Sequence, residues 1–152
     1  QTLNLVNFIN KDEPEKICRG IGMQSHVDIK VPTIELYGTA LEKFLATGYE
    51  VQITELDVTI NYDTNGSYSY ANEKETNADQ AKYVGQLMKT ILEKNRSRDK
   101  NVNPKGVTGI TLWGLYDTIS WRASCSPLLF DTGITDPKAS FYEFINAAKS
   151  MG

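Results

Sequence analysis

Histidine and cysteine are scarce in this chain of 152 residues, which holds one histidine, His26, and two cysteines, Cys18 and Cys125. A single histidine excludes any metal site built from several imidazole ligands, and two distant cysteines have no metal-binding spacing. We expect both thiols to stay free, because the alternation of strands and helices along the chain places them at opposite ends of the fold. The sequence therefore predicts neither a metal site nor a cofactor.

Excess positive charge and long apolar runs are also missing. The formal net charge is −3, and hydrophobic residues make up 40% of the chain against 23% charged residues. Without a basic stripe the sequence excludes a nucleic-acid partner, and without a long apolar run it excludes a membrane span. The first residues, Gln1 to Asn4, contain neither a methionine nor a charged-then-apolar leader. We therefore expect the chain to begin inside a longer gene product.

Helical and strand patterns alternate along the chain, and Gly and Pro mark several of the boundaries between them. Thr33 is a candidate N-cap and Gly48 a candidate C-cap for the second helix, while Asn77 with Gln80 resembles a capping box. Asp136-Pro137 is typical of the start of a last helix. The expected helices cover 2–9, 34–46, 77–92 and a final segment from 136, and the expected strands cover 17–24, 51–58 and 107–113.

Strands separated by helices predict a parallel sheet with right-handed crossovers, which makes the chain an α/β protein. An open, doubly wound sheet and a closed barrel both satisfy this order. The string Gly20-x-Gly22 after the first strand lacks the third glycine and the helix opening of a phosphate-binding loop. The sequence therefore argues weakly against a nucleotide-binding sheet.

Chemically competent side chains gather at the carboxyl ends of the expected strands, where parallel sheets and barrels form their sites. Glu55 and Asp57 are two residues apart on one strand, so they point to the same side, where His26 could balance their charge. A purely structural Asp–His pair beside a solvated Glu55 is an equally good interpretation. The further candidates near these strand ends are Gln24, Trp113, Asp117, Trp121 and Arg122.

Aromatic residues near these ends could stack on the apolar faces of sugar rings. Trp113 closes an apolar strand, which by itself favours a core position, whereas Trp121 is flanked by polar residues, which favours a surface or cleft position. Three tyrosines of the polar loop 60–77 could line a groove, but packing within their own loop is the more common role; they are Tyr62, Tyr68 and Tyr70.

Several strings of the sequence resemble consecutive signatures of glycoside hydrolase family 10, in the order that this family has them. They are GIGMQSH at 20–26, ITELDV at 53–58, TLWGLYDTISWR at 111–122, PLLFD at 127–131 and PKA at 137–139. The resemblance implies the C-terminal portion of a (β/α)8 TIM barrel, from helix 5 through helix 8 with strands 6–8. It also implies the activity of a retaining endo-β-1,4-xylanase.

The same resemblance implies a role for each candidate residue. Glu55 would be the catalytic nucleophile, and His26 would hydrogen-bond Glu55 while being held in turn by Asp57. Sugar contacts in the subsite on one side of the cleaved bond would come from Gln24, Trp113, Trp121 and Arg122. Tyr116 stands at a variable position and receives no role.

The family's general acid/base, a glutamate after an asparagine at the end of the fourth strand, has no counterpart in this sequence. Asp117 and Asp131 come too late in the chain to replace it. We expect the chain to be inactive alone and to act beside the N-terminal part of the same barrel, which carries strands 1–5 and the acid/base glutamate. Part of an opened barrel would also expose two sheet edges and an inner face that we expect to be apolar.

Two other functions stay open at this stage. The chain could bind xylo-oligosaccharides, or serve as an assembly fragment, without hydrolysing them. It could also belong to a related barrel that acts on another β-1,4-glucan. Because a polymeric substrate such as xylan cannot enter a cell, we expect an extracellular, secreted protein.

Overall fold

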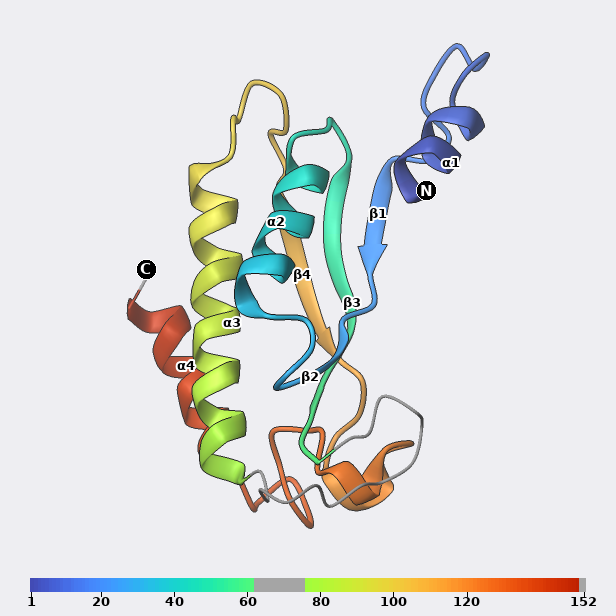
Figure 1. Cartoon of the computed structure of the whole chain (residues 1–152). Helices are drawn as coiled ribbons and strands as arrows, with labels where there is room; N and C mark the ends of the chain where they lie inside the picture. Colours follow the sequence, from blue (N-terminus) through green and yellow to red (C-terminus); the bar gives the residue numbers. More distant parts are fainter. Residues whose placement is uncertain (62–75, 151–152) are drawn as a thin grey trace.

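The computed structural model describes residues 1–61 and 76–150, in which helices alternate with parallel strands (Figure 1). Tyr62, Tyr68 and Tyr70 lie outside the described residues. The helices are α1 (Thr2–Ile9), α2 (Ile34–Leu45), α3 (Asn77–Ser97) and α4 (Ala139–Ser150), with short 3-10 turns η1 (Asp117–Ile119) and η2 (Ala123–Cys125). The strands are β1 (Gly20–Met23), β2 (His26–Asp28), β3 (Glu50–Thr59) and β4 (Val107–Leu112).

The sheet is built around β3, and every pairing in it is parallel. β1 pairs with the first half of β3 and β2 with its second half, while β4 pairs with β3 on the opposite side. The sequence predicts one strand over 17–24; the structure instead has two short strands with a break at Gln24 and Ser25. The prediction of a parallel α/β sheet is confirmed.

The hydrophobic core lies between the sheet and the helices α2, α3 and α4, which Figure 1 shows on one side of β3. Val51 and Ile53 of β3 are fully buried there against Leu41 of α2 and Leu87 of α3. Val6 of α1 joins a smaller cluster at the start of β1. In the described part of the chain, no helix is both long and apolar enough to cross a membrane. Cys18 and Cys125 are not joined to each other by a disulfide.

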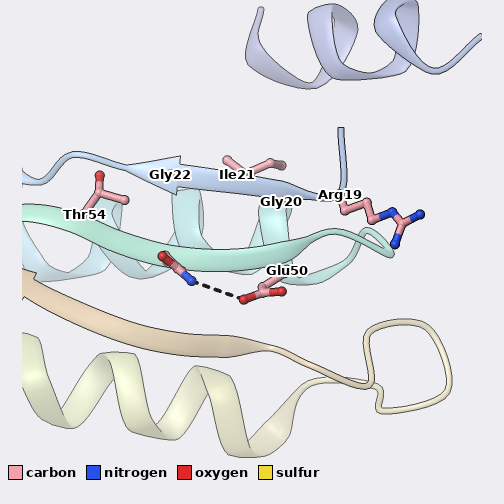
Figure 2. Close-up of a pocket in the computed structure, with 7 residues that line it drawn as sticks. Arg19, Gly20, Ile21, Gly22, Glu50 and Thr54 are labelled. Carbon is pink, nitrogen blue, oxygen red and sulfur yellow. Dashed lines mark hydrogen bonds between the residues drawn. The ribbon is translucent and has the colours of Figure 1, made fainter. Parts of the chain in front are cut away.

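The opposite face of the sheet is polar, so the expectation of an apolar inner face is wrong. Gly20, Gly22, Gln52 and Thr54 line a hollow of about 310 Å³ on this face, together with Glu50 (Figure 2). Glu50 accepts hydrogen bonds from Lys105, Thr108 and Gln52, and the ammonium group of Lys105 contributes most to lowering the pKa of Glu50 to about 2. These polar groups remain hydrated while the face is uncovered, which weakens the drive to aggregate that an apolar face would create.

A β-bulge in β3 changes which residues face this polar side. Ile53 pairs with Ile110 and Leu56 with Leu112, so β3 has one residue more than β4 between the two pairs. Ile53 and Leu56 both point into the helix-covered core. The extra residue lets Glu55 follow Gln52 and Thr54 on the inner face, whereas strict alternation would have turned it toward the helices.

Helix α2 begins as the sequence predicts, since the Thr33 side chain accepts a hydrogen bond from Leu36 N–H. The capping box of α3 lies one residue earlier than predicted, with Thr76 as N-cap and Asp79 as its partner. The carboxylate of Asp79 accepts hydrogen bonds from both the backbone N–H and the hydroxyl of Thr76. A carboxylate is stabilised at a helix N-terminus, which the neutral amide of Gln80 is not.

Two other predicted helix boundaries are wrong. Gly48 is not a left-handed C-cap, because α2 ends at Leu45, and among the described glycines only Gly106 and Gly114 have a positive φ. The last helix begins at Ala139 and not at Asp136-Pro137. The segment before it pairs instead with an earlier strand-like stretch, through Asp131 N–H to Asp136 O at 3.0 Å and Lys138 N–H to Leu129 O at 2.9 Å.

Gly106, which leads into β4, is expected to tolerate no side chain. Its φ is +68°, and an added Cβ would collide with the Asn95 and Arg98 side chains. We expect Gly106→Ala to lower the free energy of unfolding by about 2 kcal/mol or more, from backbone strain plus overpacking. Urea denaturation should show a lower midpoint for this variant. Gly109→Ala in β4 is the matched control, because no atom lies within 4 Å of its added Cβ, and an equal loss in both variants would contradict the argument.

Candidate active site

The carboxyl ends of the strands bring five of the candidate side chains together. β2 begins with His26, which pairs in register with Asp57 of β3, and the bulge places Glu55 on the same face. Trp113 directly follows β4, and its backbone N–H donates to Leu56 O at 3.0 Å, so the segment after β4 stays attached to β3. Trp121 lies between η1 and η2 at this end of the sheet.

The His26 ring lies between the two carboxylates. Its Nε2 is 3.0 Å from Glu55 Oε2, and its Nδ1 is 2.9 Å from Asp57 Oδ2. Asp57 is completely buried, whereas the side chain of Glu55 keeps 23% of its surface exposed. Asp57 therefore orients the imidazole from inside the protein, and Glu55 presents its carboxylate at the surface of the site.

The ring can donate to both carboxylates only when both nitrogens carry a proton, because a neutral imidazole has one donor and one acceptor nitrogen. A protonated His26 would place one positive charge between Glu55 and Asp57 and offset their mutual repulsion. This arrangement resolves the alternatives left by the sequence. Glu55 is a member of the hydrogen-bonded set and not a separate solvated residue.

Asp57 also contacts Trp121 and Arg122, two further side chains of the site. The indole Nε1–H of Trp121 donates to Asp57 Oδ2 at 2.8 Å, the same oxygen that faces the His26 ring. On the other carboxylate oxygen, Arg122 Nη1 approaches Asp57 Oδ1 to 3.6 Å. Sequence reasoning missed both contacts, because spacing along the chain does not show that residues so far apart meet.

The two indoles are open to solvent, with 45% of Trp113 and 58% of Trp121 exposed. Both stand edge-on to the His26 ring, with centroid separations of 6.2 Å for Trp113 and 5.0 Å for Trp121. The guanidinium of Arg122 lies over the Trp121 ring at 4.3 Å. The interpretation of Trp113 as a core residue is therefore wrong, and the exposure of Trp121 agrees with the surface or cleft position favoured for it.

Of the two remaining candidates, Gln24 lies beside the site and Asp117 does not. Gln24 is exposed beside the site, and its backbone carbonyl accepts the N–H of Glu55 at 2.9 Å. Asp117 is buried away from the site, where it pairs with Lys138 at 2.8 Å. Within residues 1–61 and 76–150, no cluster of three or more His, Cys, Asp or Glu side chains could hold a metal ion.

The arrangement can supply a nucleophilic carboxylate next to apolar ring faces. Glu55 is an oriented and partly exposed carboxylate, and two exposed indoles beside it provide surfaces on which a sugar ring can stack. The hollow on the inner face lies toward the amino ends of the strands and is lined by Arg19, Gly20 and Glu50 among others (Figure 2). It is therefore separate from this chemistry.

Comparison with known protein families gives one match that covers nearly the whole chain. The model described as glycosyl hydrolase family 10 matches residues 1–147. A bifunctional endo-1,4-beta-xylanase XylA from Ruminococcus flavefaciens is 39% identical over 149 residues, which are 98% of this chain and 13% of that protein. An endo-1,4-beta-xylanase A from Butyrivibrio fibrisolvens is 35% identical over 136 residues, which are 89% of this chain and 28% of that protein.

Solved structures agree with this match. The catalytic core of a xylanase A superposes with a TM-score of 0.75 at 28% identity, covering 96% of this chain and 44% of that one. A thermostable mutant of a xylanase from Cellvibrio japonicus gives a TM-score of 0.78 at 26% identity, covering 99% of this chain and 44% of that one. The chain thus spans less than half the length of the relatives and structures that it matches.

Proposed function

This chain belongs to glycosyl hydrolase family 10, and we propose that it supplies the nucleophile side of a retaining endo-1,4-β-xylanase site. The observation that carries the proposal is the contact of Glu55 with His26, which Asp57 holds from the buried side, beside two exposed indoles. In this reading the chain is the C-terminal part of the barrel, from the fifth to the eighth helix with strands 6–8.

Hydrolysis with retention proceeds in two displacements. Glu55 attacks the anomeric carbon while a general acid protonates the departing glycosidic oxygen, which leaves a covalent glycosyl-enzyme intermediate. Water, deprotonated by the same acid/base residue, then displaces Glu55 and releases the sugar with its original configuration. His26 Nε2 lies 3.0 Å from Glu55 Oε2, and this contact orients the carboxylate for attack.

Substrate contacts in the proposal come from side chains around this carboxylate. Trp113 and Trp121 form the walls on which a xylose ring stacks, and Gln24 and Arg122 lie at its polar edges. A related family 10 structure, at 25% identity and a TM-score of 0.75, is a xylanase from Cellvibrio japonicus in complex with xylopentaose. That likeness supports xylan or xylo-oligosaccharides as the substrate. We propose an extracellular location on the ground that a polymeric substrate cannot enter a cell.

In this proposal, the second carboxyl group of the mechanism comes from another part of the barrel. Retaining glycosidases need two carboxyl groups about 5–5.5 Å apart, and Asp117 is unsuitable because it is buried in a pair with Lys138. The polar inner face and the outer edges of β1 and β4 offer the surface on which the strands 1–5 that carry the acid/base glutamate would complete the barrel.

Complementation tests this proposal. The chain is combined with the barrel segment that precedes the matched region in the Ruminococcus flavefaciens relative, and sugar release from xylan is measured for each part and for the mixture. We expect hydrolysis only in the mixture, with the β-anomer as first product by proton NMR. An α-anomer would exclude retention, and an inactive mixture that nevertheless forms the complex would exclude the hydrolase.

A second function is favoured by the exposure of Trp113 and Trp121 in a site to which residues 1–61 and 76–150 bring no acid/base group. The chain alone could bind xylo-oligosaccharides without cleaving them. The arm of the experiment that contains only this chain addresses that possibility through calorimetric titration with xylopentaose. Heat of binding without sugar release would support the binding function, and the absence of heat would remove it.

A further inference from the structure

Ser25 has a backbone conformation that is unusual for its residue type. It occupies the break between β1 and β2 with a φ of +69°, in the left-handed region where residues other than glycine are uncommon. Such a conformation persists when surrounding contacts hold it, and it is often found beside functional sites. The hydrogen bonds of Ser25 therefore identify the groups that hold its backbone in this conformation.

The Ser25 side chain is tied to the helix layer. Its Oγ lies 2.8 Å from the hydroxyl of Tyr37 and 3.4 Å from the carbonyl of Met23. Burial in α2 raises the pKa of the Tyr37 phenol, so the hydroxyl stays protonated and can donate to Ser25 Oγ. Ser25 in turn donates to Met23 O, which satisfies every polar group of this short chain of hydrogen bonds.

The backbone on either side of Ser25 is attached to both carboxylate residues. The preceding carbonyl, of Gln24, accepts Glu55 N–H at 2.9 Å, and the carbonyl of Ser25 accepts Asp57 N–H at 3.3 Å. The next residue is His26, whose ring lies between the same two carboxylates. A change in the backbone at Ser25 would therefore move the imidazole relative to Glu55 and Asp57.

We infer that Ser25 and Tyr37 are positioning residues that fix the His26 ring between Glu55 and Asp57. In the described part of the chain neither hydroxyl is hydrogen-bonded to Glu55 or Asp57, and the pair acts through the backbone of Ser25. The consequence for hydrolysis rests on the proposed function. The positioning of the His26 ring does not depend on the proposed function, because the orientation of the ring can be observed in the chain without any substrate.

The single histidine of the chain makes this observation direct. In a proton–nitrogen spectrum of the 15N-labelled chain, all imidazole signals belong to His26. We expect the wild type to show slowly exchanging N–H signals from both ring nitrogens, since each faces a carboxylate oxygen. Ser25→Ala and Tyr37→Phe should each lose the Nε2–H signal, because the ring no longer stays aligned with Glu55.

Two further variants separate positioning from general destabilisation. Ser25→Gly loses the tether but adopts a positive φ without strain, so it should recover the ring signals that Ser25→Ala loses. Tyr49→Phe is the matched control, because it removes another buried tyrosine hydroxyl, which donates to Asn7 Oδ1 at 3.0 Å in the smaller hydrophobic cluster with Val6. Unchanged ring signals in both Ser25→Ala and Tyr37→Phe would overturn the inference, as would an equal loss in Tyr49→Phe.

In the complemented barrel, Ser25→Ala and Tyr37→Phe should lower kcat by about 10²-fold with little change in KM, since a small misplacement of a catalytic group has effects of this size. If the wild-type mixture is inactive, the proposed hydrolase fails while the spectra still decide the positioning role. If the mixture is active and the variants keep full kcat with unchanged spectra, the positioning role fails while the hydrolase stands.

Discussion

Glu55→Gln is expected to lower the rate of xylan hydrolysis by the complemented barrel by at least about 10³-fold, because an amide cannot form the glycosyl-enzyme bond. The substitution keeps the shape of the side chain, and its carbonyl oxygen can still accept from His26 Nε2–H, where Glu55 Oε2 now lies at 3.0 Å. The fold should therefore survive, and the loss should appear in kcat. Initial rates on xylan, with melting curves of both proteins, measure the effect.

Glu50→Gln is the matched control for this experiment. It makes the same substitution in the same strand, on a glutamate that pairs with Lys105 at 2.7 Å toward the amino end of the sheet. Its rate should equal that of the wild type. If Glu50→Gln and Glu55→Gln lose activity together, the loss comes from damage to the sheet and not from the nucleophile.

Chemical rescue gives a more specific readout of the nucleophile. Glu55→Ala leaves room for a small anion such as azide on the face from which the carboxylate would attack. With an aryl xylobioside whose phenolate leaves without acid assistance, the carbon–oxygen bond breaks as a carbon–nitrogen bond forms. The expected product is the α-glycosyl azide. A β-azide, or full activity of the variant without azide, would remove Glu55 from the nucleophile role.

Periodicity was sufficient to predict the order of elements and the sharing of one face by Glu55 and Asp57. Apolar side chains repeat along α3 as Val84, Leu87 and Ile91, and they are buried as expected. Such stripes arise from the need to cover one side of a helix, which is a local property of the sequence. The same argument works for the buried positions Val51 and Ile53 of β3.

The face on which Glu55 points could not be deduced in this way. Strict alternation from Val51 and Ile53 would have turned Glu55 into the helix layer, and only the bulge before Leu56 reverses it. The bulge depends on how β3 fits against β4, so it is a property of two distant segments. Motif resemblance pointed to Glu55 without any knowledge of this bulge, because a motif reflects the result of such a fit and not its cause.

The sequence also failed to predict two helix ends and the partners of several side chains, for a related reason. A proline after an aspartate is compatible with a helix start, but at Asp136 the backbone carbonyl is used by Asp131 N–H in a turn of its own. The ion pair of Asp117 with Lys138, and the indole bond of Trp121 to Asp57, join segments that no local pattern connects. The sequence thus predicts which residues are available and leaves their partners undetermined.

The Asp117–Lys138 pair leads to the second prediction with a large effect, this time on stability. Only 4% of the Asp117 side chain and 3% of the Lys138 side chain are exposed. Asp117 Oδ1 accepts Leu128 N–H at 2.7 Å, and Lys138 Nζ donates to Asp117 Oδ2 and to Ser126 O, each at 2.8 Å. The pair thereby connects the segment that carries Trp121 to the residues just before α4.

Burial opposes the charged form of both partners, since it raises the pKa of Asp117 and lowers the pKa of Lys138 against their mutual attraction. Removing one partner should therefore be costly, because it leaves the other charge buried without compensation. We expect Lys138→Met to lower the free energy of unfolding by about 3–5 kcal/mol, and Asp117→Asn to have an effect of similar size. Urea denaturation monitored by circular dichroism provides the measurement.

The double replacement of Asp117 by Asn and Lys138 by Met decides between pairing and simple packing. Asn can still accept the Leu128 N–H, and Met fills part of the lysine volume, so neither buried charge remains. Replacing a buried ion pair with neutral groups is often neutral or stabilising, and we expect the double variant to be more stable than either single variant. Additive losses would show that the two side chains contribute independently. Lys105→Met, which breaks an exposed pair with Glu50, should change stability far less, since solvent-exposed pairs contribute little.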